Sequence, residues 1–307
     1  MTTENRKPKT ENDFKCGHVA LIGLPNVGKS TLLNKLVGEK LAITSPKPQT
    51  TRHRILGVYN QPELQVVFLD TPGLHQPRRA LNKLMVETAL ATLQEVDAVL
   101  FVVEAGAKGL EAGAKAAGVL TAADKPVVLA LNKIDLLPDK AALLPMLEEV
   151  ASWGDWAALV PISARQGDGT RQVVTELAGR LPEGGPLFPV DMLTDLSERF
   201  LAAELIREKV FRLTEREVPY SVAVTVDQFL EPAEEGRPTA ITATIHVERG
   251  GQKAIVIGKG GAMLKKIGTA ARLDMERLLG TPVFLDLFVR VEPKWSHQDR
   301  GLRKLGY

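Results

Sequence analysis

Four short polar motifs, each directly after a compact apolar run, constrain this chain more than any other feature of its sequence. The first, Gly23–Ser30 (GLPNVGKS), follows the run Val19–Ile22 and precedes a helical pattern. Its glycines allow a tight turn whose backbone N–H groups surround phosphate oxygens, and the start of a helix favours negative charge. The spacing predicts a phosphate-binding loop, in which Lys29 reaches the β- and γ-phosphates and Ser30 is a Mg²⁺ ligand. For the motif alone, a structural turn is the alternative.

The second motif, Asp70–Gly73 (DTPG), follows the apolar run Leu64–Leu69. A carboxylate at the end of that run can hold Mg²⁺, usually through water, and the amide of Gly73 can meet the γ-phosphate. Either Asp70 or Gly73 alone would be an ordinary turn residue. The position of the motif after a second apolar run makes it informative.

The third motif, Asn132–Asp135 (NKID), closes the apolar run Val127–Leu131 and is expected to select the base. Asp135 can accept hydrogen bonds from the N1–H and the exocyclic amine of guanine, whereas adenine would leave this carboxylate unpaired at a steep cost in affinity. Asn132 would brace the base and the loops, and the stem of Lys133 would pack on the ring. In isolation, NKID is also compatible with a surface turn before a helix.

The fourth motif, Ser163-Ala164, follows the run Leu159–Ile162 and can present the Ala164 amide to the guanine O6. It is informative only through its order and position. Ligands bind at the carboxyl ends of strands in open α/β sheets, so the four motifs together predict a site for GTP or GDP with Mg²⁺. The nucleotide contacts that we expect are Gly23, Pro25, Asn26, Val27, Gly28, Lys29, Ser30, Thr31, Asp70, Thr71, Pro72, Gly73, Asn132, Lys133, Asp135, Ser163 and Ala164.

A first switch segment is expected at Thr44–Arg54 (TSPKPQTTRHR), which is polar and contains prolines. We choose Thr51 as the hydroxyl that reaches Mg²⁺ and the γ-phosphate, with Thr50 as the alternative because spacing does not separate adjacent threonines. Loss of the γ-phosphate would release this segment together with Gly73–Arg79. The expected metal ligands are Ser30, Thr51 and Asp70, and the expected catalytic residues are Lys29, Thr51 and Gly73.

Leu74 occupies the position at which a Ras-like GTPase carries the glutamine that orients the attacking water. An apolar side chain cannot orient water. His75 is nearby, but we interpret it as a solvated loop residue. The sequence therefore predicts slow intrinsic hydrolysis, accelerated by a partner or by groups elsewhere in the switches.

The first half of the chain alternates short apolar runs with helical patterns, and 307 residues exceed the usual size of one domain. Compact runs of this kind are typical of buried parallel strands, so we expect a doubly wound α/β domain of P-loop GTPase type, with a mostly parallel sheet and helices on both faces. Expected strands are Val19–Ile22, Leu64–Leu69, Ala98–Val103, Val127–Leu131 and Leu159–Ile162, and expected helices lie at about Lys29–Val37, Leu81–Leu93, Glu111–Ala122, Lys140–Ser152 and Arg171–Arg180.

The proline- and glycine-rich stretch Leu181–Val190 suits neither a helix nor a central strand and indicates a linker. Beyond it, a helical pattern is followed by three segments of alternating apolar residues, which mark strands with one buried face. These elements are Ser197–Leu213, Val222–Val226, Ile241–Val247 and Val283–Val291, with a helix at about Ala262–Leu279 before the last strand. We expect a disordered extension (residues 1–15), a GTPase domain (16–181), a linker (182–195), an α+β domain (196–292) and a basic tail (293–307).

The small domain contains the stretch Ile255–Gly261 (IVIGKGG), in which we expect a short apolar strand or a turn followed by a GxxG loop. Such a loop in KH domains lets a nucleic-acid backbone approach closely and clamps about four single-stranded nucleotides. A plain glycine turn is the alternative, and a dinucleotide-binding loop is disfavoured because the full G-x-G-x-x-G is missing. The expected RNA contacts are Gly258, Lys259, Gly260, Gly261, Lys265 and Lys266, with the lysines facing phosphates.

Positive charge is concentrated at the end of the chain. From Gly258 onward there are ten Lys and Arg residues against five acidic ones, although the net charge of the whole chain is only +2. A basic end suggests a polyanionic partner, and a solvated tail is the alternative if charge is taken alone. Trp295 in the tail can stack on a base or pack in the core; we favour the core because exposed tryptophan is unusual.

The remaining composition is that of an ordinary globular protein, with 44% hydrophobic and 25% charged residues. No apolar run approaches the roughly 18 residues of a membrane span, and the N-terminus has no apolar signal region. Cys16 is the only cysteine, which excludes an intramolecular disulfide and fits a reducing compartment.

Taken together, these segments resemble the Era family of bacterial GTPases, which belongs to the TrmE-Era-EngA type. The stretches GLPNVGKSTLLNKLVG, PQTTRHRI, FLDTPGLH, NKID and VIGKGG carry the resemblance, which covers the chain from Val19 to Leu305. It implies a GTPase domain joined to a type II KH domain, binding near the 3′ end of small-subunit ribosomal RNA, and a role in maturation of the small ribosomal subunit. It also implies a hydrophobic residue in place of the catalytic glutamine, in agreement with Leu74.

Three functional hypotheses compete. The favoured one is a ribosome-assembly factor in which the nucleotide state controls whether the KH surface is free to bind rRNA. The second is a membrane- or cell-cycle-linked signalling GTPase, for which the KH-like unit would be an interaction domain. The third is a passive RNA chaperone that gains little from hydrolysing GTP. We expect a cytoplasmic monomer. Besides the cytoplasm, the alternative location is peripheral, on the cytoplasmic face of the inner membrane.

Overall fold

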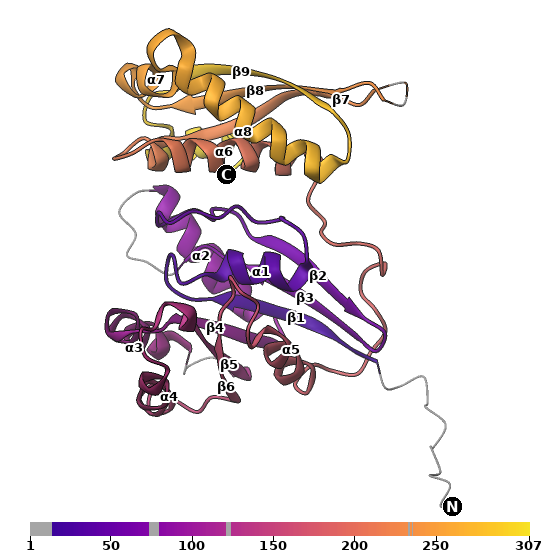
Figure 1. Ribbon diagram of the computed structural model, residues 1–307, viewed down its shortest axis with the longest axis vertical. Helices are drawn as coiled ribbons and strands as arrows, with labels where there is room; N and C mark the ends of the chain where they lie inside the picture. Colours follow the sequence, from indigo (N-terminus) through magenta and orange to yellow (C-terminus); the bar gives the residue numbers. More distant parts are fainter. Residues whose placement is uncertain (1–13, 74–79, 121–123, 233, 235) are drawn as a thin grey trace, which may run out of the picture.

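The computed structural model describes residues 14–73, 80–120, 124–232, 234 and 236–307, which form two stacked domains (Figure 1). The first domain contains a six-stranded sheet in the order β2-β3-β1-β4-β5-β6, in which all neighbours are parallel except β2 and β3. The predicted mostly parallel sheet is confirmed, and all five predicted strands are present. The strands are β1 (Lys15–Ile22), β2 (Ile55–Gln61), β3 (Leu64–Asp70), β4 (Ala98–Glu104), β5 (Val127–Asn132) and β6 (Ala158–Ile162).

Helices cover both faces of this sheet, because successive side chains of a buried strand point to opposite sides. The core that contains Val19 and Leu21 is covered by α1 and α5, and the core that contains Ala20 and Ile22 by α2, α3 and α4. The carboxyl ends of the parallel strands therefore meet at one edge, where the four motifs follow them. The helices are α1 (Lys29–Val37), α2 (Ala80–Gln94), α3 (Ala107–Leu120), α4 (Leu143–Ala151) and α5 (Thr170–Ala178), with short 3₁₀ turns η1 (Ile134–Leu136) and η2 (Lys140–Ala142).

Strand β2 is the one element of this sheet that the sequence did not predict. It pairs antiparallel with β3 at the sheet edge and directly follows the switch segment. Gly57 interrupts its apolar pattern, and a Cβ atom there would lie 2.7 Å from Cδ1 of Leu33. The glycine therefore lets α1 pack directly on the strand. It also interrupts the apolar alternation by which a strand is predicted from sequence.

The second domain is a three-stranded sheet with helices on one face (Figure 1). Strands β7 and β8 are antiparallel, and β8 and β9 are parallel, so the order is β7-β8-β9. Helices α6 and α8 supply core residues such as Ile206 and Ile267, which share one core with Ile245 of β8. The elements are α6 (Glu198–Leu213), η3 (Pro219–Ser221), β7 (Ala223–Leu230), β8 (Thr239–Val247), α7 (Gly250–Ile257), η4 (Lys259–Gly261), α8 (Ala262–Leu279) and β9 (Val283–Val291).

The short strand predicted before the GxxG loop was wrong, because Ile255–Ile257 forms the last turn of helix α7. The helix begins with a capping interaction, in which Oε1 of Gln252 accepts hydrogen bonds from the backbone N–H groups of Arg249 and Glu248 at 3.1 and 2.9 Å. Only Val256 of the apolar run is buried, whereas Ile255 is 51% exposed. A run of β-branched residues thus resembles a strand, but the cap and the one-sided burial select a helix.

Residues 293–307, predicted as a basic tail, fold back onto the molecule as η5 (Trp295–His297) and α9 (Asp299–Lys304). Trp295 is 1% exposed, and its Nε1 donates to the backbone oxygen of Ser221 at 3.0 Å. The prediction that Trp295 packs in the core is confirmed. Its cluster also includes Leu81 and Met85 of α2, so it joins the second domain to the first.

The connection between the domains is attached to the first domain. Oε1 of Gln65 accepts hydrogen bonds from the backbone N–H groups of Leu187 and Phe188 at 2.7 and 2.9 Å, and the N–H of Val58 donates to the oxygen of Leu193 at 2.8 Å. The segment predicted as a linker thus follows strands β2 and β3. Among the helices in the described part of the chain, none is both long and apolar enough to cross a membrane.

Candidate functional site

The glycine-rich loop joins β1 to α1 and is held in shape by its own lysine. Lys29 is 6% exposed, and its Nζ donates to the backbone oxygens of Gly23 and Leu24 at 3.1 and 3.0 Å. Gly28 has φ 105°, and a Cβ atom there would lie 2.3 Å from Nδ2 of Asn132. Burial lowers the pKa of Lys29 to about 8, and a bound phosphate would favour the charged ammonium again.

Three oxygen-bearing side chains meet beside this loop. The Ser30 hydroxyl donates to Oδ2 of Asp70 at 2.6 Å and lies 2.8 Å from Oγ1 of Thr51, which is itself 3.4 Å from the same carboxylate oxygen. Asp70 is fully buried, and its Oδ1 has no hydrogen-bond partner among the residues that the structure describes. Mg²⁺ prefers hard oxygen ligands and keeps several waters, so this donor set and the unpaired oxygen fit a magnesium ion. Burial raises the pKa of Asp70 to about 6, and a cation would favour its ionised form.

The geometry separates the two adjacent threonines. Oγ1 of Thr50 donates to the backbone oxygen of Lys47 at 2.8 Å, whereas Oγ1 of Thr51 lies with Ser30 and Asp70. This arrangement favours Thr51 as the hydroxyl of the switch segment, as we predicted.

The motif after β3 packs against the phosphate-binding loop. Oγ1 of Thr71 donates to the backbone oxygen of Leu21 at 2.8 Å. A Cβ atom on Gly73 would lie 2.7 Å from the backbone nitrogen of Pro25, so only glycine allows this approach. Leu74 and His75, like the rest of residues 74–79, lie outside the described residues, and the predictions about them stay predictions.

The guanine motifs are connected to each other and to the phosphate loop through Asn132. Its Nδ2 donates to the backbone oxygen of Val27 at 2.7 Å, and its Oδ1 accepts from the amide of Ala164 at 2.9 Å. The Ser163 hydroxyl donates to Oδ1 of Asp135 at 2.7 Å, which fixes the carboxylate expected to recognise guanine. Lys133 Nζ pairs with Glu104 at 2.7 Å.

A cavity of about 830 Å³ opens beside these motifs. It is large enough for a nucleotide, since ligand sites commonly measure about 300–1,000 Å³. Of the expected nucleotide contacts, Pro25, Asn26, Gly28, Lys29, Ser30, Thr31, Gly73 and Lys133 line it, together with Thr51. Asp135, Ser163 and Ala164 are not among its lining residues but adjoin it through Lys133 and Arg165.

Two of the residues that line this cavity, both arginines, were not predicted from the sequence. Arg165 directly follows Ser163-Ala164, so its position beside a nucleotide motif was a usable signal. Arg212 comes from helix α6 of the second domain, and no local pattern in the sequence indicates its proximity. The nucleotide cavity is therefore bounded by both domains.

The switch segment contacts the second domain at several positions, through Thr44, Lys47, Thr50 and Arg52. Nζ of Lys47 donates to the backbone oxygen of Phe211 at 2.5 Å, and Nη2 of Arg207 donates to the backbone oxygen of Thr50 at 2.6 Å. Arg207 is 1% exposed and pairs with Glu204, so its contact with Thr50 is shielded from water.

Arg52 is the most deeply inserted side chain of this segment, with 4% exposure. Its guanidinium donates to the backbone oxygens of Val222 at 2.5 Å and Pro219 at 3.1 Å. It also donates to the Tyr307 hydroxyl at 3.1 Å and lies within cation–π distance of three rings. The three rings belong to Phe211, Trp295 and Tyr307, at 5.5, 5.7 and 5.8 Å from the guanidinium carbon.

The GxxG loop joins α7 to α8 in a conformation that needs glycine. Gly258, Gly260 and Gly261 have φ values of 72°, 59° and 79°, and a Cβ atom on Gly258 would lie 2.7 Å from Cβ of Met263. Lys259 and Lys266 are exposed beside it.

A groove of about 380 Å³ continues from this loop between α8 and β9. Lys265 lines it, as do Thr269, Arg272 and Asp286, which we did not predict. Residues 265, 269 and 272 recur at helical spacing, and that signal would have identified the α8 wall. The β9 wall depends on strand pairing, which the local sequence does not contain.

Comparison with family models identifies both domains. Residues 18–133 match the family described as "50S ribosome-binding GTPase", and residues 217–296 match the KH domain family.

Comparison with whole proteins extends this similarity over nearly the full chain. GTPase Era of Geobacter metallireducens is 55% identical over 301 residues, covering 97% of this chain and 99% of the relative. A solved structure of Aquifex aeolicus Era bound to GDP and AlF₄⁻ has 42% identity and a TM-score of 0.89, covering 96% of this chain and 99% of that one. A structure of Era with MgGDPNP and nucleotides 1506–1542 of 16S ribosomal RNA has 41% identity and a TM-score of 0.87, with the same coverage.

Proposed function

Because this chain belongs to the Era family of GTPases, we propose that it is a GTP-switched factor that binds the 3′ region of small-subunit rRNA and assists maturation of the small ribosomal subunit. Its enzymatic activity is Mg²⁺-dependent hydrolysis of GTP to GDP and phosphate. The KH domain is the RNA-binding part.

The small subunit is favoured over the large one, although the matching family model mentions the 50S subunit. That model covers only residues 18–133, the nucleotide-binding part, which carries no information on RNA choice. The relatives that share the full chain, including the KH domain, are Era proteins, and one was solved with 16S rRNA.

One observation carries the proposal of a switch: neighbouring residues of one segment belong to the two sites. Thr51 lies with Ser30 and Asp70 at the metal site, and Arg52 is buried in the second domain. Any displacement of Thr51 when the γ-phosphate is lost therefore acts on the packing around Arg52.

Each nucleotide residue has a defined task in this scheme. The amides of the glycine loop and Lys29 hold the phosphates, and Gly73 brings its backbone to the γ-phosphate side. Ser30, Thr51 and Asp70 would hold Mg²⁺, which supplies charge neutralisation for the phosphates when bound. Asp135 selects guanine, with Asn132 and Ser163 fixing the loops around it.

Hydrolysis is proposed to be slow, because Leu74 replaces a water-orienting glutamine. RNA would be held by the GxxG loop and by the groove that Lys265, Thr269 and Arg272 line. We also propose a cytoplasmic location for the protein; contact with the inner membrane stays a prediction.

The test is RNA affinity in two nucleotide states. An RNA of the sequence of nucleotides 1506–1542 of 16S rRNA is titrated into protein with GDP or with a non-hydrolysable GTP analogue, and we expect tighter binding with the analogue. Equal binding in both states would favour a passive RNA chaperone. No binding in either state would leave a signalling GTPase as the better hypothesis.

A matched pair of variants locates the RNA site. Gly260→Asp places a negative charge in the GxxG loop, whereas Gly236→Asp places one in the β7–β8 connection; both glycines have positive φ and open space around a Cβ atom. We expect a loss of about tenfold or more in RNA affinity for the first variant, since it repels phosphates, and little change for the second.

A further inference from the structure

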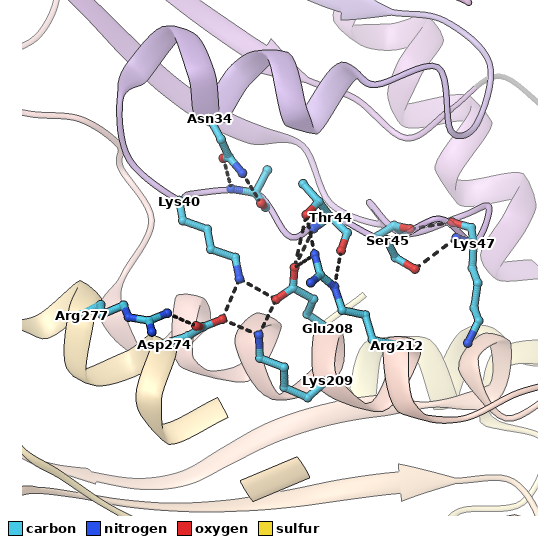
Figure 2. A network of polar contacts seen from close by, with 12 residues as sticks. Asn34, Lys40, Thr44, Ser45, Lys47, Glu208, Lys209, Arg212, Asp274 and Arg277 are labelled. Carbon is cyan, nitrogen blue, oxygen red and sulfur yellow. Dashed lines mark hydrogen bonds and ion pairs between the residues drawn. The ribbon is translucent and has the colours of Figure 1, made fainter. Parts of the chain in front are cut away.

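Helix α6 of the KH domain extends an arginine to the nucleotide cavity. Arg212 lines the same cavity as Lys29 and Ser30, and its side chain is 45% exposed. Its Nε and Nη2 donate to the backbone and side-chain oxygens of Thr44, both at 2.9 Å, as Figure 2 shows. Nη2 also pairs with Glu208 at 3.1 Å. Among the described residues, none accepts a hydrogen bond from Nη1. The two N–H groups of this nitrogen can therefore donate to a ligand.

A buried carboxylate fixes the position of this arginine. Glu208 is fully buried and accepts from the backbone N–H of Thr44 at 3.0 Å and from the ammonium groups of Lys40 and Lys209 at 2.6 and 2.9 Å. Residues of both domains thus hold one carboxylate, which in turn holds Arg212 (Figure 2). A guanidinium anchored at one side presents its other side in a defined direction.

Among the described residues, this network contains more cations than carboxylates. Asp274 joins it through Lys40 at 2.7 Å and through Lys209 and Arg277, so two carboxylates face four cations. The carboxylates are Glu208 and Asp274, and the cations are Lys40, Lys209, Arg212 and Arg277. Of these six groups only Arg212 lines the cavity, so it is the cation of this network that faces the nucleotide.

We propose that Arg212 is a nucleotide ligand supplied by the KH domain, donating from Nη1 to a phosphate oxygen of the bound guanine nucleotide. This inference rests on the proposed function of the cavity as the GTP site. The nucleotide site is therefore complete only when the two domains are docked through Glu208 and Thr44. By linkage, a nucleotide that binds Arg212 strengthens this docking by the same factor by which docking strengthens nucleotide binding.

The experiment compares the full-length variants Arg212→Ala and Asp274→Asn. Asp274→Asn loosens the same interdomain network but alters no residue that lines the cavity. Kd values for GTP and GDP are measured at low and high salt, and unfolding temperatures check that both variants fold. Arg212→Ala is expected to weaken binding about tenfold, as for a lost hydrogen bond between charged groups, and to reduce its salt dependence. Asp274→Asn is expected to stay within about twofold of the wild type.

Three outcomes decide the matter. Wild-type affinity in Arg212→Ala would overturn the inference and leave the proposed GTP site untouched. Equal losses in both variants would also overturn it, because the effect would then come from docking alone. A wild-type protein that binds no GTP would contradict the proposed function itself.

Discussion

The Thr51 hydroxyl lies 2.8 Å from that of Ser30, whereas the Thr50 hydroxyl donates to the Lys47 backbone. We expect Thr51→Ala to weaken GTP binding about tenfold and to affect GDP binding little, because its hydroxyl serves the state in which the γ-phosphate is present. Thr50→Ala, the matched control, is expected to leave the affinities for GTP and GDP close to those of the wild type. Titration of both nucleotides in Mg²⁺ measures this, and a larger loss in the Thr50 variant would contradict the assignment.

Base selection rests on the Asp135 carboxylate, which Ser163 holds at 2.7 Å. Asp135→Asn removes the acceptor for the guanine amine and introduces a donor, which suits the C2 oxygen of xanthine. We expect GTP affinity to fall about a hundredfold while XTP affinity rises. Asp139→Asn is the control, because Asp139 caps η2 outside the cavity. Competition between GTP and XTP measures the change, and unaltered preference would show that another group reads the base.

Residues in contiguous motifs were accessible from sequence, because Ser30, Asp70 and Asn132 belong to motifs that occur in a fixed order at the carboxyl ends of strands. The choice between Thr50 and Thr51 was not accessible from sequence, since both satisfy the same spacing. Only the structure shows that their hydroxyls point to different partners. Arg212 was not accessible either, because its place at the cavity depends on how α6 packs against the switch segment.

At the scale of elements, the switch segment is a bridge between domains rather than a free loop. Its isolated sequence is polar and gives no sign of order, yet Arg52 is 4% exposed within the KH domain. Strand β2 and helix α7 were similarly missed or misassigned, because Gly57 hides a strand and Ile255–Ile257 resembles one. In each case, contacts with another element decide the structure.

Arg52→Ala removes the charged group that satisfies two buried carbonyls. We expect it to destabilise the protein by about 2–3 kcal/mol, through the unsatisfied oxygens of Pro219 and Val222. We also expect RNA affinity to become independent of the nucleotide, since the link from Thr51 to the second domain is broken. Arg54→Ala is the matched control, as Arg54 pairs with Glu95 on the surface. Chemical denaturation and the two-state RNA titration measure both effects. Retained nucleotide dependence in Arg52→Ala would contradict a coupling through this residue.

At the scale of the whole molecule, the C-terminal residues join the domains by an apolar contact. Trp295 packs with Leu81 and Met85 of the first domain and with Leu302 and Leu305 of the chain end. The charge pattern of residues 293–307 predicted a basic tail. The packing could not be predicted from that pattern, because the buried side chains are widely spaced among basic ones. The contacts between the two domains therefore include this apolar cluster, the Arg52 site and the Glu208 network, besides the hydrogen bonds that Lys47 and Arg207 make.

Calorimetry on Trp295→Ala tests whether the apolar contact stabilises both domains. Truncating a buried tryptophan costs about 3–5 kcal/mol. Because the cluster contains residues of α2 as well as of the second domain, we expect the thermal transitions of both domains to fall. Trp153→Ala is the control, since Trp153 packs against the core on the α2–α4 face of the first domain. It should lower the first domain's transition and leave the second unchanged. If Trp295→Ala lowered only the second domain's transition, Trp295 would be a core residue of that domain without a role in joining the two.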